Sequence, residues 1–149
     1  MKHTEAGLKE GLAMNRKGQT FINAEILNEN TGKSKKISFL IDTGFDGYLQ
    51  LSQSDISELG LEIKEKSLST LANGHKVETG IVKTKVKIFT QEISNFPIQF
   101  LPNGVAIIGT QLLRDAKKMI LFDYEDGYVT ITGEAKLKKE IKLLVDKIV

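Results

Sequence analysis

Three times along this chain, two runs of β-type residues flank a short polar segment that contains glycine. The pairs are residues 20–27 with 36–41, 67–72 with 75–89, and 119–124 with 128–132. Runs of this kind around a glycine-containing turn are typical of β-hairpins. The strongest turn signal is Asn73-Gly74 in the second pair, because both residue types tolerate positive φ angles. The chain is therefore expected to fold mainly as antiparallel β-structure.

Two further apolar runs extend the expected sheet. Residues 93–101 are predicted to form a strand, in which Pro97 favours an edge position or a bulge because proline has no backbone N–H to donate. Residues 105–108 are a short apolar run suited to a buried strand. Together with the three hairpins, these runs predict a small β-barrel or β-sandwich.

Short helices are expected between and after these strands. Residues 52–59 begin with serines that suit an N-cap and are followed by Gly60, which favours a helix end. Residues 110–118 form a second helical pattern. Residues 134–149 carry a lysine-rich face opposite an apolar stripe made of Leu137, Ile141, Leu144 and Ile148. This last helix can pack on its own domain or take part in a dimer contact, and the sequence leaves both open.

Chain length allows one ordinary domain with additional ends. With 149 residues, of which 40% are hydrophobic, the chain can bury one core but not two. Residues 1–18 contain few apolar residues and are expected to be a flexible segment with at most a short helix around residues 6–14. The main domain is expected at residues 19–133, followed by the amphipathic helix at residues 134–149.

Composition argues against several classes of partner. The net charge is only +2, and the lysines are mostly interspersed with acidic or apolar residues, so nucleic-acid binding is not expected. No apolar run reaches membrane-spanning length. The chain has no cysteine, which fits a reducing compartment such as the cytoplasm. His3 and His75 have no further ligands at metal spacing, so no metal site is predicted.

The residues best suited to chemistry follow directly after the strand at residues 36–41. They are Asp42, Thr43 and Gly44, a carboxylate and a hydroxyl beside a glycine. The apolar residues before Asp42 indicate that its carboxylate lies at the end of a buried strand, where an acid–base group is useful. The alternative is a β-turn in which the Asp side chain caps its own backbone.

A second motif later in the chain repeats this pattern of an apolar run followed by a glycine and a helix. It consists of Ile107, Ile108 and Gly109, followed by the helix at residues 110–118. The order of hairpin, Asp-Thr-Gly, projecting hairpin and second glycine motif resembles the retropepsin-like aspartic peptidases over residues 20–131. The sequence Asp-Thr-Gly-Phe is similar to a prokaryotic branch of that clan. The resemblance implies a closed β-barrel in which Ile107, Ile108 and Gly109 support the strand and loop of Asp42.

The resemblance also implies an aspartic endopeptidase that works as a homodimer on an extended peptide or protein substrate, without metal or cofactor. One chain has a single Asp-Thr-Gly, so Asp42 of each chain would enter a shared site. In aspartic peptidases two such carboxylates hold one proton between them, because like charges at close range cannot both ionise easily. Thr43 would then link the two loops, and Gly44 would permit close approach of the substrate.

Substrate-binding residues are implied by the same resemblance. They are Phe45 and Asp46 after the triplet, and the flap residues Leu71, Ala72, Asn73, Gly74 and His75. Phe45 stands where many family members have a small residue, and it would crowd the pocket or select small side chains. Asp46 matches an acidic position that retroviral members pair with an arginine, but the matching place here is Thr110. A retropepsin-like module that dimerises or binds peptides without cutting them is therefore the alternative function.

Overall fold

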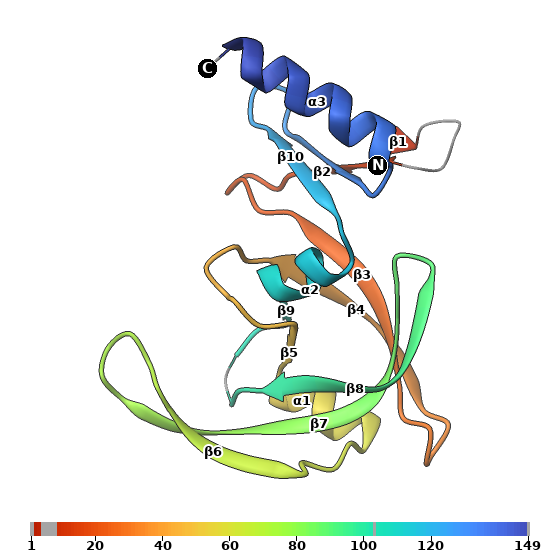
Figure 1. Ribbon diagram of the computed structural model, residues 1–149. Helices are drawn as coiled ribbons and strands as arrows, with labels where there is room; N and C mark the ends of the chain where they lie inside the picture. Colours follow the sequence, from red (N-terminus) through yellow and green to blue (C-terminus); the bar gives the residue numbers. More distant parts are fainter. Residues whose placement is uncertain (1, 4–8, 103, 149) are drawn as a thin grey trace. The chain divides into compact units, whose positions relative to one another are not determined.

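The computed structural model describes residues 2–3, 9–102 and 104–148, and the side chains from residue 12 onward. The chain forms two compact units (Figure 1). One unit is Phe21–Leu112, and the other consists of Met1–Thr20 with Leu113–Val149.

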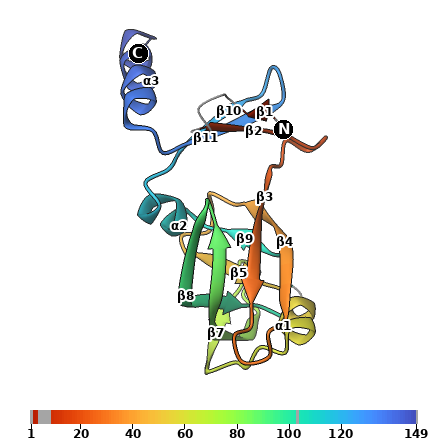
Figure 2. The same cartoon turned by 90° about the vertical axis from the view of Figure 1, so that its right-hand side faces the viewer.

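The unit Phe21–Leu112 is a closed six-stranded β-barrel with one additional strand. The strands pair in the order β3 (Phe21–Leu27), β4 (Ser34–Ile41), β9 (Ile107–Ile108), β5 (Leu49–Leu51), β8 (Gln91–Phe100) and β7 (Lys76–Ile88). A second pairing, between β7 and β3, closes the barrel. Figure 2 shows β8, β7, β3 and β4 side by side in this order. The predicted mainly-β barrel is confirmed.

Alternation along the strands produces the barrel core. In β3, for example, Ile22, Ala24 and Ile26 are buried while the residues between them are exposed or half-buried. Side chains of the other strands meet them inside the barrel; among those with no more than 1% exposure are Phe39, Leu49, Leu51, Val82, Val86, Ile98 and Ile108. Because successive side chains of a strand point to opposite faces, the two-residue period of the sequence determines which residues enter this core.

The helix α1 (Gln53–Leu59) lies where the sequence predicted it. The Ser52 hydroxyl caps its first turn by accepting a hydrogen bond from the Asp55 N–H at 3.2 Å. Gly60, with a φ of 63°, ends the helix in the left-handed conformation that glycine adopts without strain.

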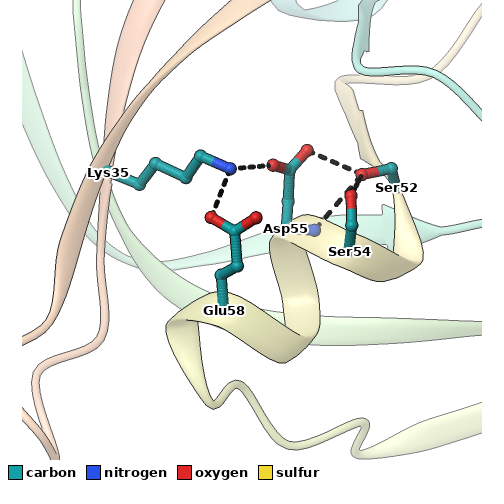
Figure 3. A network of polar contacts seen from close by, with 5 residues as sticks. All are labelled: Lys35, Ser52, Ser54, Asp55 and Glu58. Carbon is teal, nitrogen blue, oxygen red and sulfur yellow. Dashed lines mark hydrogen bonds and ion pairs between the residues drawn. The ribbon is translucent and has the colours of Figure 1, made fainter.

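A charged network joins α1 to β4 (Figure 3). The Lys35 ammonium lies 2.8 Å from Asp55 Oδ1 and 2.6 Å from Glu58 Oε2. The Ser52 hydroxyl donates to the other oxygen of Asp55 at 2.8 Å. The hydrogen bond to Asp55, followed by that to Glu58, raises the pKa of Lys35 above its ordinary value. The network therefore supplies Asp55, which is only 8% exposed, with polar partners.

The additional strand β6 (Glu65–Thr70) pairs with β7 and forms the predicted hairpin. Its turn contains three residues, since Leu71 N–H donates to the His75 carbonyl and Gly74 N–H donates to the Leu71 carbonyl. Only Gly74 has a positive φ, of 84°, so the turn differs from the two-residue type that Asn73-Gly74 suggested. The yellow-green hairpin extends away from the barrel strands (Figure 1).

Pro97 lies in the interior of the sheet order and not at its edge, because β8 stands between β7 and β5. A proline is tolerated there because β5 pairs with β8 only at Gln99 and Phe100. No residue of β5 therefore needs a hydrogen bond from the backbone nitrogen of Pro97, which has no hydrogen to donate. The alternative prediction for Pro97 was a bulge. A register shift between Thr84 and Val86 is present nearby in the pairing of β7 with β8.

The second unit contains a four-stranded sheet in the order β1 (Lys2–His3), β2 (Lys9–Ala13), β11 (Tyr128–Thr132) and β10 (Met119–Asp123). The predicted hairpin of residues 119–124 with 128–132 is confirmed. The helix expected around residues 6–14 is wrong for residues 9–13, which form a strand, while residues 6–8 lie outside the described part of the chain. The physical reason is that β2 pairs with β11 over its whole length, which outweighs a weak local helix preference.

Helix α2 (Thr110–Asp115) ends three residues earlier than predicted. Lys117 adopts a φ of 54°, and Lys118 N–H turns back to the Leu113 carbonyl at 3.0 Å. This left-handed residue stops the helix before residue 118.

Helix α3 (Ala135–Ile148) confirms the predicted C-terminal helix, but none of its residues is buried. Leu137 and Ile141 are half-buried, whereas all residues from 142 to 148 are exposed. Within the part of the chain that the structure describes, no helix has the length and apolar character that crossing a membrane requires.

Candidate active site

Strand β4 ends at Ile41 and leads directly into Asp42. Its last residues pair in parallel with β9, with Leu40 opposite Ile107 and Ile41 opposite Ile108. The Asp42 N–H donates to the Ile108 carbonyl at 3.0 Å. The two motifs that the sequence singled out are therefore neighbours, and the backbone of one holds the start of the other.

The Asp42-Thr43-Gly44 triplet forms a tight turn. Asp42 Oδ1 accepts a hydrogen bond from the Gly44 N–H at 2.9 Å, and the Asp42 carbonyl accepts one from the Phe45 N–H at 3.1 Å. Asp42 is half-buried, and Thr43 and Gly44 are exposed. The turn thus fixes the direction of the carboxylate and leaves the next two residues at the surface of this chain. The hydrogen bond to Gly44 is also the one expected of an Asp that caps its own turn, so it does not by itself separate the two interpretations.

Gly109 holds the triplet loop against the start of α2. Its N–H donates to the Tyr48 carbonyl at 2.9 Å, and the two following N–H groups, of Thr110 and Gln111, donate to the carbonyls of Phe45 and Gly47 at 2.9 and 3.1 Å. A methyl group at Gly109 would lie 2.7 Å from the Phe45 carbonyl oxygen and even closer to that of Gly47. Only a residue without a side chain permits this approach, because ordinary contacts are longer.

Phe45 packs its ring against Gly47. A methyl group at Gly47 would lie 2.6 Å from Phe45 Cε1 and closer still to Cζ. The role of Gly47 was not predicted from sequence, although a glycine two residues after Phe45 is the signal that could have indicated it. Thr110, at the place of the retroviral arginine, bonds to the Phe45 carbonyl, and the side chain of Asp46 is exposed.

A cavity of about 420 Å³ lies between the β6–β7 hairpin and the barrel. Its apolar wall consists of Tyr48, Leu49, Ile81, Pro97 and Ile98. Ser67, Ser69 and Thr79 add hydroxyl groups from the hairpin. Neither Phe45 nor the five predicted flap-tip residues line this cavity; the strands of the hairpin do so instead.

Of the five residues predicted to form the flap tip, Ala72, Asn73, Gly74 and His75 are exposed and Leu71 is half-buried. The His75 N–H donates to Asn73 Oδ1 at 3.0 Å, which stabilises the turn. Among the described residues, no group of three or more His, Cys, Asp or Glu side chains is placed to hold a metal ion.

A closed barrel with an Asp-Thr-Gly loop, a supporting strand with a second glycine and a hairpin over a cavity defines the retropepsin-like class of aspartic peptidase folds. The family model described as aspartyl protease matches residues 23–113, which is more than half of the chain. This chain belongs to the retropepsin-like aspartyl protease family.

Solved structures agree with this assignment. A retropepsin-like aspartic protease from Rickettsia conorii is 25% identical to this chain, with a TM-score of 0.62 over 82% of this chain and 97% of that one. EIAV protease in complex with the inhibitor HBY-793 is 20% identical, with a TM-score of 0.56 over 74% of this chain and 100% of that one, and supports the fold. A comparison with curated protein sequences gave no match.

Proposed function

We propose that this chain is an aspartic endopeptidase that hydrolyses peptide bonds as a homodimer. The observation that carries the proposal is the position of Asp42, which is half-buried at the end of β4 and whose N–H donates to the Ile108 carbonyl of the second motif at 3.0 Å. A carboxylate that is oriented by the backbone and still reachable from outside is suited to proton transfer with a bound water.

The chemistry and the sequence together support a homodimer. Hydrolysis of a peptide bond needs a base to activate water and an acid to protonate the carbonyl oxygen. One carboxyl group cannot be ionised and protonated at the same moment, and the chain has only one Asp-Thr-Gly. Two copies of Asp42 at close range would share one proton, because like charges oppose the ionisation of both.

In the proposed reaction, the ionised Asp42 takes a proton from water as the water oxygen attacks the peptide carbonyl carbon. The protonated Asp42 of the second chain gives its proton to the carbonyl oxygen, which forms a neutral diol. The first carboxyl group then protonates the leaving nitrogen, and the C–N bond breaks as the diol returns a proton to the second carboxylate. The two carboxyl groups thereby hold one proton again, as they did at the start, and no step requires a metal or a cofactor.

The neighbouring residues take supporting roles in this proposal. Thr43 and Gly44 are exposed in the single chain, where a second copy can meet them. The Thr43 hydroxyl would link the two loops, and Gly44 would leave room for the substrate backbone. Exposed residues 72–75 at the tip of the β6–β7 hairpin would close over an extended peptide, bind it as an added strand and exclude water.

The test is cleavage of a diverse peptide library by the purified chain, from acidic to neutral pH. Asp42→Asn keeps the size of the side chain but removes the acid–base group, and it is expected to abolish cleavage. Asp126→Asn, an exposed change in the β10–β11 turn, is the matched control and should cut like the wild type. Absence of cleavage by a wild-type protein shown to be dimeric would overturn the proposal in favour of a module that dimerises or binds peptides without cutting them.

A further inference from the structure

Gln50 is a polar residue buried inside the barrel unit. It is the middle residue of β5 and only 7% exposed, and its neighbours Leu49 and Leu51 are buried as well. Its backbone pairs with Gln99 of β8 on one side and with Ile107 of β9 on the other. Burial of an amide side chain among apolar residues is costly unless the amide is hydrogen-bonded, so the partner of this side chain is informative.

The partner is the backbone of the segment that joins β8 to β9. Gln50 Nε2 donates to the Val105 carbonyl at 3.1 Å. The last backbone pair between β5 and β9 is at Ile107, so the side chain extends the hold of β5 by two residues. Gly104 permits this approach, because a methyl group there would lie only 2.9 Å from Gln50 Nε2.

The other edge of β9 holds the start of the Asp42 loop. The carbonyl groups of Ala106 and Ile108 accept the N–H groups of Leu40 and Asp42, both at 3.0 Å. Val105 directly precedes Ala106 in the chain. The Gln50 carboxamide therefore fixes the backbone immediately before the first of the two bonds that connect β9 to the end of β4.

We propose that Gln50 is a positioning residue for the proposed reaction, whose carboxamide holds Val105 so that β9 keeps Asp42 in place for proton transfer. This inference rests on the proposed peptidase function and adds to it a residue outside the Asp-Thr-Gly motif. Gln50 acts through Val105 and β9 and not by contact with the reacting atoms. A displacement of about 1 Å can slow an enzyme reaction about a hundredfold, so one hydrogen bond at this place has a measurable effect.

The test measures kcat and KM for one peptide that the wild type cleaves. Gln50→Met keeps the length of the side chain and removes the donor, and it is expected to lower kcat about tenfold with little change in KM, because it displaces the acid–base group. Gln53→Met makes the same exchange at an exposed residue of α1 and should leave both constants unchanged. Assays are made where circular dichroism shows every protein to be folded, so unfolding does not account for a loss.

Gln50→Glu adds a pH-dependent readout. A protonated carboxyl group can donate to the Val105 carbonyl, whereas an ionised one can only accept and is repelled by it. Relative to the wild type at the same pH, kcat of Gln50→Glu should be nearly unchanged in acid and fall about tenfold as the new carboxyl group ionises. Gln99, Ile107 and Val105, which pair with or bond to Gln50, have no titratable side chain, so the ratio reports the new group. For Gln50→Met the ratio should be low at every pH.

Hydrogen exchange supplies a measurement that does not depend on cleavage. Gln50→Met should speed exchange of the Leu40 and Asp42 amides, which bond to β9, about tenfold. The Lys64 amide, which bonds to the Ile81 carbonyl at 2.9 Å, is the matched control and should exchange as in the wild type.

Two results would overturn the inference while the wild type still cuts. One is an unchanged kcat in Gln50→Met, and the other is a Gln50→Glu ratio that does not vary with pH. If Gln50→Met does not fold, the pH dependence of Gln50→Glu decides alone. Absence of any wild-type cleavage would overturn the proposed function, and unchanged exchange at Leu40 and Asp42 would then show that Gln50 does not position this loop.

Discussion

Gly47 and Gly109 both lie beside Phe45, but a side chain at each position would meet different atoms. This difference predicts how substitutions at the three positions should combine. A methyl group at Gly47 would meet only the ring of Phe45. A methyl group at Gly109 would meet the backbone carbonyl oxygens of Gly47 and Phe45 as well as the ring. Neither glycine has a positive φ, so space and not backbone conformation requires them.

The magnitudes follow from these contacts. Gly109→Ala forces two carbonyl groups away and weakens the hydrogen bonds that Thr110 and Gln111 donate to them, at 2.9 and 3.1 Å. Overpacking costs about 1–3 kcal/mol and a lost hydrogen bond about 1 kcal/mol, so the free energy of unfolding should fall by about 2–4 kcal/mol. Gly47→Ala should cost about 1–3 kcal/mol, because the Phe45 ring has to leave its place.

Phe45→Ala separates the two cases because it removes the ring and retains the carbonyl. In that background Gly47→Ala should cost less than about 0.5 kcal/mol, while Gly109→Ala should keep most of its cost. The six proteins to compare are the wild type, Phe45→Ala, and each glycine substitution with and without Phe45→Ala. Urea denaturation followed by far-UV circular dichroism measures their free energies of unfolding, since the chain has no tryptophan to report on unfolding. Equal costs of Gly47→Ala with and without the Phe45 ring, or a harmless Gly109→Ala, would refute this account of the loop.

Three further predictions concern other parts of the chain. Lys35→Met should lower the free energy of unfolding by about 1–2 kcal/mol, because Asp55 loses its ammonium partner. The raised pKa of Lys35 means that this difference from the wild type is present at neutral pH and up to pH 10.5 and is lost as the pH rises further, which denaturation at several pH values checks. Gly74→Ala, at a φ of 84°, should cost about 1 kcal/mol by the same assay, and no cost would contradict the turn described. Thr43→Val should weaken the dimer in analytical ultracentrifugation and Thr43→Ser should not; equal dissociation would remove Thr43 from the proposed interface.

Local patterns predicted two of the hairpins and two of the helices, because the residues that form each of these elements are close in sequence. The β3–β4 and β10–β11 pairs, the Ser52 cap and Gly60 end of α1, and the helix α3 all depend on residues close in sequence. Strand β2 was missed because its partner β11 is more than a hundred residues away, and residues 9–13 carry no strong β pattern of their own. The early end of α2 was missed because a lysine, and not a glycine, adopts the left-handed conformation at residue 117.

The candidate site was likewise predicted only in part from the sequence. The meeting of Asp42 with Ile108 was expected only through the family resemblance, since nothing in either segment alone shows that the two strands pair. The hydroxyl cluster of Ser67, Ser69 and Thr79 was not predicted, because it depends on the register between β6 and β7. Counting back from a two-residue turn at Asn73-Gly74 would have placed Leu68, and not Ser67, opposite Thr79, so the three-residue turn of the structure decides which side chains meet.

Subunit mixing tests the central claim most directly, because an active site built from Asp42 of two chains behaves differently from one built within a single chain. A fixed amount of wild-type protein is mixed with increasing amounts of Asp42→Asn, allowed to exchange subunits, and assayed for peptide cleavage. A shared site predicts that cleavage falls to about half at equal amounts of the two proteins and continues to fall with excess variant, since mixed dimers hold only one acid–base carboxyl group. Cleavage that stays constant, although exchange is shown by mass spectrometry of tagged chains, would contradict the shared site.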